Sequence, residues 1–383
     1  MLGRLKKTTM GALSLLALLN MPTSGQSADI PPGGGAVFAM TNATRDNRIV
    51  AFRRAANGTL VINGRVSSRG RGIGTDLDTQ GALQLSDDNR FLYAANAGSD
   101  DISVFAVDGT ELTFLQKVPA GDVPNSLTIS GNLLYALLGS VAGNGITGFR
   151  IEADGTLTPL PNSFRLLSSP IAVPGSIQFS PDGRVLLVTH KVTNVLVPPG
   201  RIIDAFTVGA DGLPSAAPRP NRSNGLRPFS TDIRGDGTVV VIESFNAAPN
   251  RSAVSSYNLG PDGELAVISR SIPNMQTDGC WIIITNDGRY FYTANFGSGT
   301  ISSYRFERNG EIRLLDSTAA RLGPNSQPVD LALSEDGRFL YLLLRGRGSI
   351  AAFRIRDDGS LQALDVSPRG LPDNFGISGM AAY

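Results

Sequence analysis

The chain has 383 residues, of which 41% are hydrophobic and 17% are charged, with 44 Gly and 23 Pro. This length predicts two domains, one large closed architecture or a repeat array. Thirty-four basic residues against 33 acidic residues give a net charge of +1, which argues against a nucleic-acid surface. One Cys and one His exclude a disulfide framework and any multi-histidine metal site.

The first 28 residues are expected to be a signal peptide. Three basic residues precede a short apolar core at residues 10–19, and the small residues at 23–25 suit cleavage. The apolar core is too short to span a bilayer, and no later segment reaches 18 apolar residues, so we expect no membrane span. The sequence therefore predicts a secreted or periplasmic protein, with residues 29–36 as a short linker.

The rest of the chain is a repeat that is marked by hairpin turns. Asp-Gly or Asn-Gly, followed within three residues by Leu or Ile, occurs seven times at spacings of 46 to 57 residues. These dipeptides accept positive φ and close tight hairpins. The seven turns begin at Asn57, Asp108, Asp154, Asp211, Asp262, Asn309 and Asp358. Six further turns lie between them and begin at Asp88, Gly131, Asp182, Asp236, Asp287 and Asp336.

Two hairpin turns in each repeat predict four antiparallel strands, which is the unit of a propeller blade. Residues 37–383 are therefore expected to form an all-β, seven-bladed β-propeller of four-stranded antiparallel blades. A seventh inner turn is missing. Residues 376–383 resemble the first strand of a repeat and residues 37–40 resemble a second strand, so the two strands that this turn would join lie at opposite ends of the chain. The C-terminal segment is expected to supply the innermost strand of the first blade and to close the ring.

Three segments carry a resemblance to a known family. Residues 80–107, 177–194 and 280–305 resemble the lactonase-family seven-bladed β-propellers, which include 6-phosphogluconolactonase-like proteins and fungal carboxymuconate cyclases. The chain is more similar still to their exported bacterial relatives, and the resemblance covers residues 37–383. It implies hydrolysis or formation of a small carboxylated lactone, without a metal or other cofactor. A protonatable His or Glu and Arg groups that hold an anionic substrate would carry this chemistry.

Candidate residues come from the face on which innermost strands start and second strands end, since long connections also open there. Glu243 and His190 match the acid–base role and are the expected catalytic residues, and Arg227 is expected to converge with them on the channel mouth. The other expected substrate-binding residues are Arg345, Asn96, Asn295 and Trp281.

Two functions stay open. The first is an exported lactonase-like or cyclase-like enzyme that acts on a small acidic or lactone-type molecule. Export argues against 6-phosphogluconolactone itself, since phosphorylated sugars are cytosolic. The second is a non-catalytic exported propeller with a protein or surface partner, as a binding, scaffold or surface-adhesion module. The absence of a His at every innermost-strand start, where the 6-phosphogluconolactonase-like enzymes carry one, favours this second reading.

Overall fold

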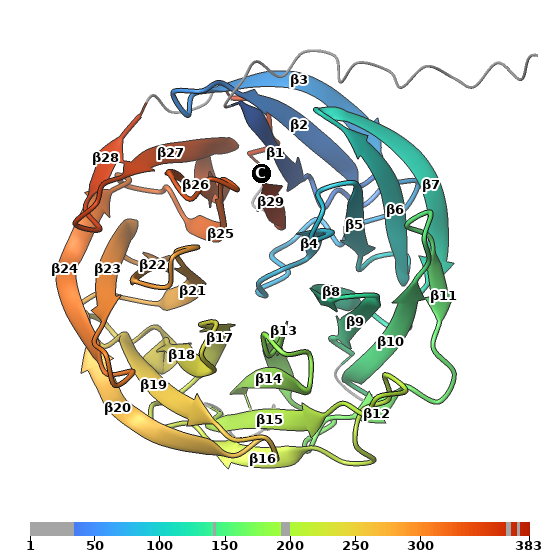
Figure 1. The fold of residues 1–383 in the computed structure, drawn as a ribbon. Helices are drawn as coiled ribbons and strands as arrows, with labels where there is room; N and C mark the ends of the chain where they lie inside the picture. Colours follow the sequence, from blue (N-terminus) through green and yellow to red (C-terminus); the bar gives the residue numbers. More distant parts are fainter. Residues whose placement is uncertain (1–33, 141–142, 193–199, 365–368, 374–375) are drawn as a thin grey trace, which may run out of the picture.

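Seven antiparallel sheets surround a common axis (Figure 1). The computed structural model describes residues 34–140, 143–192, 200–364, 369–373 and 376–383, so the expected signal peptide lies outside the described residues. These residues contain only strands, two short 3-10 turns and connections, and none of their helices is long and apolar enough to cross a membrane. The predicted all-β, seven-bladed propeller is confirmed.

The blades are numbered in chain order, and their strands are given from the axis outward. Blade 1 contains β29 (Met380–Ala382), β1 (Gly35–Met40), β2 (Arg48–Arg54) and β3 (Leu60–Ser67). Blade 2 contains β4 (Leu83–Leu85), β5 (Phe91–Asn96), β6 (Asp101–Asp108) and β7 (Glu111–Pro119). Blade 3 contains β8 (Pro124–Ser130), β9 (Leu133–Leu138), β10 (Gly145–Ile151) and β11 (Leu157–Pro159), and β12 (Arg165–Leu166) also pairs with β10. Blade 4 contains β13 (Val173–Phe179), β14 (Val185–Val192), β15 (Ile202–Thr207) and β16 (Arg219–Arg222).

Blade 5 contains β17 (Pro228–Ile233), β18 (Thr238–Glu243), β19 (Ala253–Leu259) and β20 (Leu265–Pro273). Blade 6 contains β21 (Gly279–Ile284), β22 (Tyr290–Asn295), β23 (Thr300–Phe306) and β24 (Ile312–Arg321). Blade 7 contains β25 (Pro328–Leu333), β26 (Phe339–Leu344), β27 (Ser349–Ile355) and β28 (Leu361–Ala363). The 3-10 turns are η1 (Phe245–Ala247) and η2 (Arg345–Arg347).

Burial follows the position of a strand within its blade. Second strands such as β18 and β26 are buried along their whole length, because they have strands on both sides and neighbouring blades on both faces. The outermost strand β7 alternates between exposed and more buried residues, as expected when one face meets solvent. The apolar core is therefore spread over the interfaces between blades.

A repeated tyrosine contact joins four pairs of neighbouring blades. In each case a buried tyrosine of the second strand donates its hydroxyl to the carbonyl of the turn glycine in the next blade. The pairs are Tyr93–Gly155 at 3.0 Å, Tyr135–Gly212 at 2.7 Å, Tyr292–Gly359 at 2.9 Å and Tyr341–Gly58 at 3.0 Å. The turns that the sequence predicts thus also accept hydrogen bonds that hold the ring together.

The C-terminal strand closes the ring, as predicted. β29 pairs antiparallel with β1, with Phe38 opposite Ala381. The backbone N–H of Met40 donates to Gly379 at 3.1 Å, which extends the pairing beyond the strand itself. Asp330 of blade 7 accepts the N–H of Gly379 at 2.6 Å and the N–H of Gly81 at 3.2 Å, so one buried carboxylate ties blade 7 to the chain entering the innermost strands of blades 1 and 2. Burial raises the pKa of Asp330 to about 6.

Truncation after Gly376 should open the ring. The change removes β29, exposes the edge of β1 and leaves the Asp330 carboxylate without the Gly379 donor. We expect aggregation or a large loss of unfolding cooperativity in differential scanning calorimetry. A synthetic peptide of residues 377–383 should partly restore the transition, whereas a truncated protein that melts like the full chain would contradict closure by β29.

The hairpin turns have the left-handed backbone that their glycines predict. The glycines of the seven outer turns have φ between +62° and +92°, as Gly109 and Gly58 show at the two limits. Gly237 at an inner turn has φ +87°, and an added Cβ would meet no atom within 4 Å there. Gly235 in the same turn also has open space around it but has no positive φ. The two positions therefore separate backbone strain from steric clash.

Gly237→Ala should destabilise the protein by about 1 kcal/mol, because an L-residue is strained at this φ. Gly235→Ala should be neutral or slightly stabilising, since alanine restricts the unfolded chain without strain at this position. Chemical denaturation of both variants measures the difference. Equal stabilities would show that the turn does not require glycine at position 237.

Candidate functional site

A connection between blades 1 and 2 reaches across the axis. Residues 76–81, here called the crossing segment, lead from β3 into β4 and extend toward the centre of the ring in Figure 1. The hydroxyl of Thr79 donates to the carbonyl of Asn125 in blade 3 at 2.6 Å, and the N–H of Gln80 donates to Gly175 in blade 4 at 3.2 Å. The Gln80 amide also bonds both backbone groups of Ile282 in blade 6, at 2.9 and 3.0 Å. The segment is thus fixed to innermost strands around the ring.

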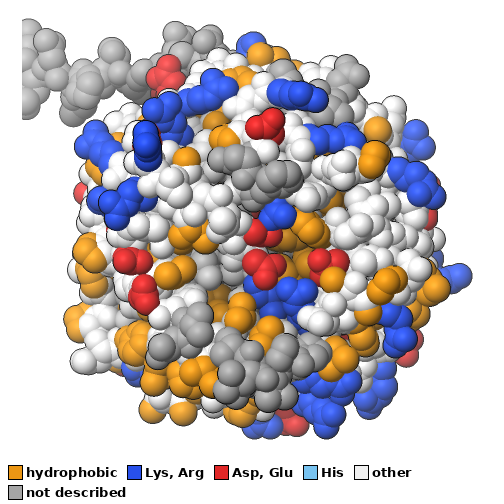
Figure 2. Space-filling model, turned by 180° about the vertical axis from the view of Figure 1, so that it is seen from behind, with side chains coloured by type: hydrophobic (Ala, Val, Ile, Leu, Met, Phe, Trp, Pro, Cys, Tyr) orange, Lys and Arg blue, Asp and Glu red, His pale blue; other side chains and the backbone are white. Residues whose placement is uncertain are grey.

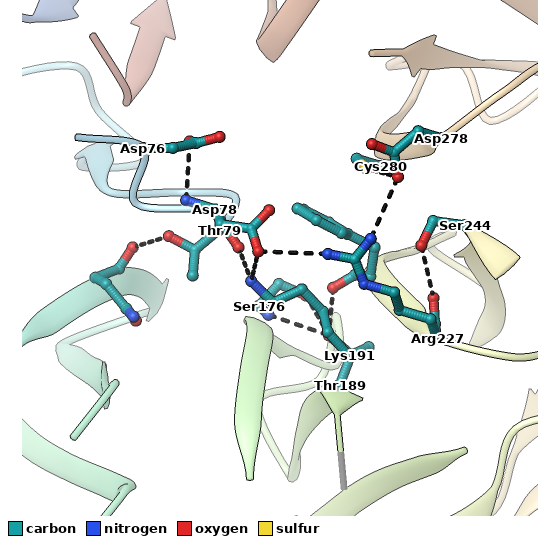
Figure 3. Close-up of polar contacts among 12 residues, drawn as sticks. Asp76, Asp78, Thr79, Ser176, Thr189, Lys191, Arg227, Ser244, Asp278 and Cys280 are labelled. Atoms are coloured by element: carbon teal, nitrogen blue, oxygen red, sulfur yellow. Dashed lines mark hydrogen bonds and ion pairs between the residues drawn. The ribbon is translucent and has the colours of Figure 1, made fainter. Parts of the chain in front are cut away.

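Three cationic side chains meet carboxylates of this segment, as Figure 3 shows in part. Lys191 at the end of β14 places Nζ 2.6 Å from Oδ2 of Asp78. Arg227, which precedes β17, places Nη2 3.5 Å from the same oxygen. Arg345 of η2 forms an ion pair with Asp76. Residues from blades 4, 5 and 7 therefore converge on two carboxylates of one connection.

A third carboxylate completes the group. Arg227 Nη1 lies 3.3 Å from Oδ1 of Asp278, which immediately precedes β21. We call Asp76, Asp78, Lys191, Arg227, Asp278 and Arg345 the mouth cluster. Acidic and basic side chains also lie together at the centre of the face in Figure 2. The cluster holds three positive and three negative groups, so it is neutral overall.

Aromatic rings lie beneath the cations. Lys191 Nζ is 4.9 Å from the centre of the Phe229 ring, and the Arg345 guanidinium is 4.7 Å from that of Phe296. The Lys191 side chain is only 1% exposed. A buried ammonium without a counter-charge would be costly, and the Asp78 carboxylate supplies that counter-charge.

Asp278 has the properties of a proton acceptor at this place. Burial raises the pKa of Asp278, although the positive charge of Arg227 opposes the rise. Its side chain is still 16% exposed, so water reaches the carboxylate. The Cys280 thiol lies 3.4 Å from Asp278 Oδ1 and donates to it; burial raises the pKa of this thiol well above its ordinary value, so it stays protonated.

The mouth cluster also contains unusual backbone conformations. Asp78, Arg227 and Asp278 have φ of +52°, +54° and +53°, in the left-handed region that non-glycine residues avoid. Val123 and Gln327 have similar φ and also directly precede an innermost strand. A residue with this strained backbone thus directly precedes the innermost strand of blades 3, 5, 6 and 7. In blades 5 and 6 this residue is Arg227 and Asp278, respectively.

Glu243 is not part of this cluster. Its carboxylate is fully buried and accepts hydrogen bonds from Gly225 N–H at 2.7 Å, Ser255 Oγ at 2.7 Å and Ser271 Oγ at 2.6 Å. Burial raises the pKa of Glu243, and the serine hydroxyls oppose the rise. The bond to Gly225 fixes the chain two residues before Arg227, so the carboxylate supports the segment that carries this arginine.

His190 has a similar position in blade 4. The ring is fully buried, and Nε2 lies 2.9 Å from Asp204 Oδ2 on the third strand. Among the described residues, no hydrogen bond or ion pair joins His190 or Glu243 to the mouth cluster. The structure therefore does not bring His190, Glu243 and Arg227 together as the sequence predicts. The adjacent residue Lys191 reaches the mouth instead.

Asn96 and Asn295 are also buried in their blades. Asn96 Nδ2 donates to Asp101 and Ser103, both at 2.8 Å. Asn295 Nδ2 donates in the same pattern to Thr300 at 3.1 Å and Ser302 at 2.9 Å. Both amides link the second strand to the third strand, and both side chains are fully buried, so neither offers an atom to a ligand at the mouth.

Trp281 and Arg345 complete the sequence candidates. The Trp281 ring is 1% exposed and packs on Phe229, with ring centres 4.9 Å apart, so it has no free face for stacking on a ligand. Its indole N–H donates to the carbonyl of Thr79 at 3.1 Å and helps to fix the crossing segment. Arg345 lies in the mouth cluster, as does Arg227. Of the predicted residues, these two arginines are brought to one place.

The sequence reasoning missed Asp76, Asp78, Lys191 and Asp278. One feature of the sequence could have pointed to Lys191: it is one of only four lysines in the chain and directly follows the single histidine. No feature of the sequence pointed to Asp76 and Asp78, because their segment has no counterpart in the other repeats. Among the described residues, no three His, Cys, Asp or Glu side chains are placed to hold a metal ion.

Comparisons with known proteins agree with this architecture. The 6-phosphogluconolactonase of Yersinia pestis (strain Pestoides F) is 23% identical over 325 residues, which cover 82% of this chain and 90% of that protein. The periplasmic gluconolactonase PpgL of Pseudomonas aeruginosa has a similar structure, with a TM-score of 0.69 and 17% identity over 91% of this chain and 99% of that chain. A protein from Lactobacillus plantarum has a TM-score of 0.67 and 16% identity over 91% of this chain and 98% of that chain.

The similar solved structures show only that the fold is shared, whereas a family model shows to which family the chain belongs. The model of the family described as "Lactonase, 7-bladed beta-propeller" matches residues 45–174 and 236–330, which is more than half of the chain. The matched residues include β2–β12 and β18–β24 in full. The chain therefore belongs to the lactonase family of seven-bladed β-propellers.

Proposed function

We propose that this propeller hydrolyses a small lactone that carries an anionic group, and that the reaction takes place at the mouth cluster. The observation that supports this most is the pairing of Arg227 with Asp278, a partly buried carboxylate whose pKa is raised, in a cluster that holds two further cations. Cations bind an oxyanion, and a carboxylate with a raised pKa is a better general base than an ordinary one. The named relatives add a lactone as the class of substrate.

Arg227 is the group that we assign to the substrate anion. A guanidinium has five N–H donors, and Arg227 makes one contact with the carboxylate of Asp78 and one with that of Asp278. Its side chain is 17% exposed, so donors remain accessible from the mouth. Lys191 is almost fully buried and holds Asp78, which makes it a positioning residue for the crossing segment.

Asp278 is the group that we assign to proton transfer. Its carboxylate takes a proton from water, and the resulting hydroxide attacks the lactone carbonyl carbon. The ring C–O bond then breaks, and the proton held by Asp278 passes to the leaving alkoxide, which yields the open hydroxy acid.

We further propose that the protein is exported and that its substrate is not phosphorylated. The N-terminal pattern at residues 1–28 supports export, as does the periplasmic neighbour PpgL. Phosphorylated sugar lactones are cytosolic, so an exported enzyme would meet lactones of free sugar acids. The substrate anion in this proposal is therefore a carboxylate.

A non-catalytic binding propeller is the second candidate. One observation favours it: each of the three mouth cations already has a carboxylate partner within the chain. A site that only binds needs no proton acceptor, so the role of Asp278 separates the two functions.

Asp278→Asn should lower kcat for a carboxylated lactone by about two to four orders of magnitude, because it removes the proton acceptor. Asparagine tolerates the left-handed backbone at this position, so folding should be close to normal. In the wild type, kcat/KM should fall as the pH drops through the pKa of Asp278, which burial raises from its ordinary value. A pH-stat assay on glucaric acid lactone and on neutral gluconolactone measures both effects.

Arg227→Ala provides the matching test of binding. It should raise KM for the carboxylated lactone and leave KM for gluconolactone nearly unchanged. Asp357→Asn, an exposed change at an outer turn, is the control and should leave both substrates unaffected. No hydrolysis of any lactone by the wild type, or wild-type turnover in Asp278→Asn, would leave the binding module as the function.

Glu243→Gln tests whether Glu243 is catalytic, as the sequence predicts, or supports the segment before Arg227, as the structure indicates. If Glu243 only holds the chain before Arg227, the variant should lose about 1 kcal/mol of stability or more and raise KM, with the pH profile of kcat unmoved. A catalytic Glu243 would instead cost kcat by orders of magnitude and remove one limb of the pH profile. Kinetics over a range of pH, beside the unfolding curve, decides between these results.

A further inference from the structure

An open groove lies between blades 1 and 7, apart from the mouth cluster. Its volume is about 530 Å³, and its lining comes from the β1–β2 connection, the start of β2, β3, η2 and residues 369–373. Five arginines line it, against the two acids Asp46 and Asp373. The five are Arg45, Arg48, Arg65, Arg347 and Arg369.

Four of these arginines have no carboxylate partner among the described residues. Arg48 Nε is paired with Asp46 at 2.6 Å. Arg65 Nη2 donates to the carbonyl of Gly370 at 2.7 Å, and Arg347 Nη2 donates to that of Pro324 at 3.2 Å. For Arg45 and Arg369, the described part of the chain shows no hydrogen bond or ion pair.

This arrangement differs from that of the mouth cluster, where each cation has a carboxylate. The chain as a whole has a net charge of only +1, so a local excess of positive charge is not a consequence of its composition. Guanidinium groups that have no carboxylate partner repel one another, and a bound anion would remove this repulsion.

We propose that this groove binds a small polyanion that carries at least two carboxylate or phosphate groups. Planar guanidinium groups bind both kinds of oxyanion through paired N–H donors. Their placement on four separate segments suits a ligand with more than one charged group, since a single carboxylate reaches only part of the lining. The volume lies in the range of small-ligand pockets, and Ala43, Leu371 and Pro372 add apolar surface.

The groove is a separate site from the mouth, although η2 contributes to both. Arg345 at the start of η2 pairs with Asp76, whereas Arg347 at its end lines the groove. Variants at Arg347 and Arg227 can therefore assign a bound anion to one site or the other.

Isothermal titration calorimetry with citrate and with pyrophosphate tests the proposal, at low ionic strength so that screening is weak. Wild type should bind one or both more tightly than acetate. Binding of only one would identify carboxylate or phosphate as the group recognised. The double variant Arg347→Ala, Arg369→Ala should weaken binding by about tenfold or more, because it removes two of the four unpaired guanidinium groups.

Two controls complete the experiment. Arg308→Ala, Arg313→Ala removes the same charge from exposed positions of blade 6 and should leave binding unchanged, as should Arg227→Ala. Arg45→Glu is a second groove variant at an exposed position, in case the double variant does not fold. The proposal is overturned if wild type binds neither polyanion, if the blade 6 control weakens binding as much as the groove variant, or if only Arg227→Ala abolishes it.

Discussion

The short pairing of β29 with β1 is the contact on which the rest of the molecule depends. A propeller has no covalent ring, and here the first blade is built from both ends of the chain, which joins the two ends of the row of blades. Here three residues of backbone pairing and the two N–H groups that Asp330 accepts complete the circle. Because the ring is closed, strand ends of blades far apart in sequence are held at a fixed distance from the axis.

This closed ring explains why buried residues at strand ends affect the mouth without facing it. Glu243 holds the chain before Arg227, and His190 anchors the strand that presents Lys191. Asn96 and Asn295 make the equivalent link in blades 2 and 6. A polar residue at the end of a second strand is thus part of the frame of each of these blades, and in blades 4 and 5 it supports the segment that carries a cation of the mouth cluster.

The blades could be predicted from the sequence because two residues are enough to encode a tight turn. Asp-Gly and Asn-Gly mark each outer hairpin, and the incomplete count of inner turns indicated that the C-terminus completes blade 1. The site was less accessible to this reasoning. Topology places both His190 and Lys191 near the mouth, but which of them turns inward depends on local register, including the bulge in the β13–β14 pairing. The contact between Asp78 and Arg227 joins residues far apart in sequence, through a segment that occurs once.

The charges of the mouth cluster are matched within the chain for a physical reason. Lys191 is almost fully buried, and without Asp78 its ammonium would lie on the Phe229 ring with no counter-charge. Folding therefore requires the internal carboxylate before any ligand is present. Arg227 is more exposed and has donors that its two carboxylate contacts do not use, so an anion can bind to it while Asp78 stays in place. The buried pair then maintains the structure, and the exposed guanidinium beside Asp278 is the part of the cluster on which chemistry can act.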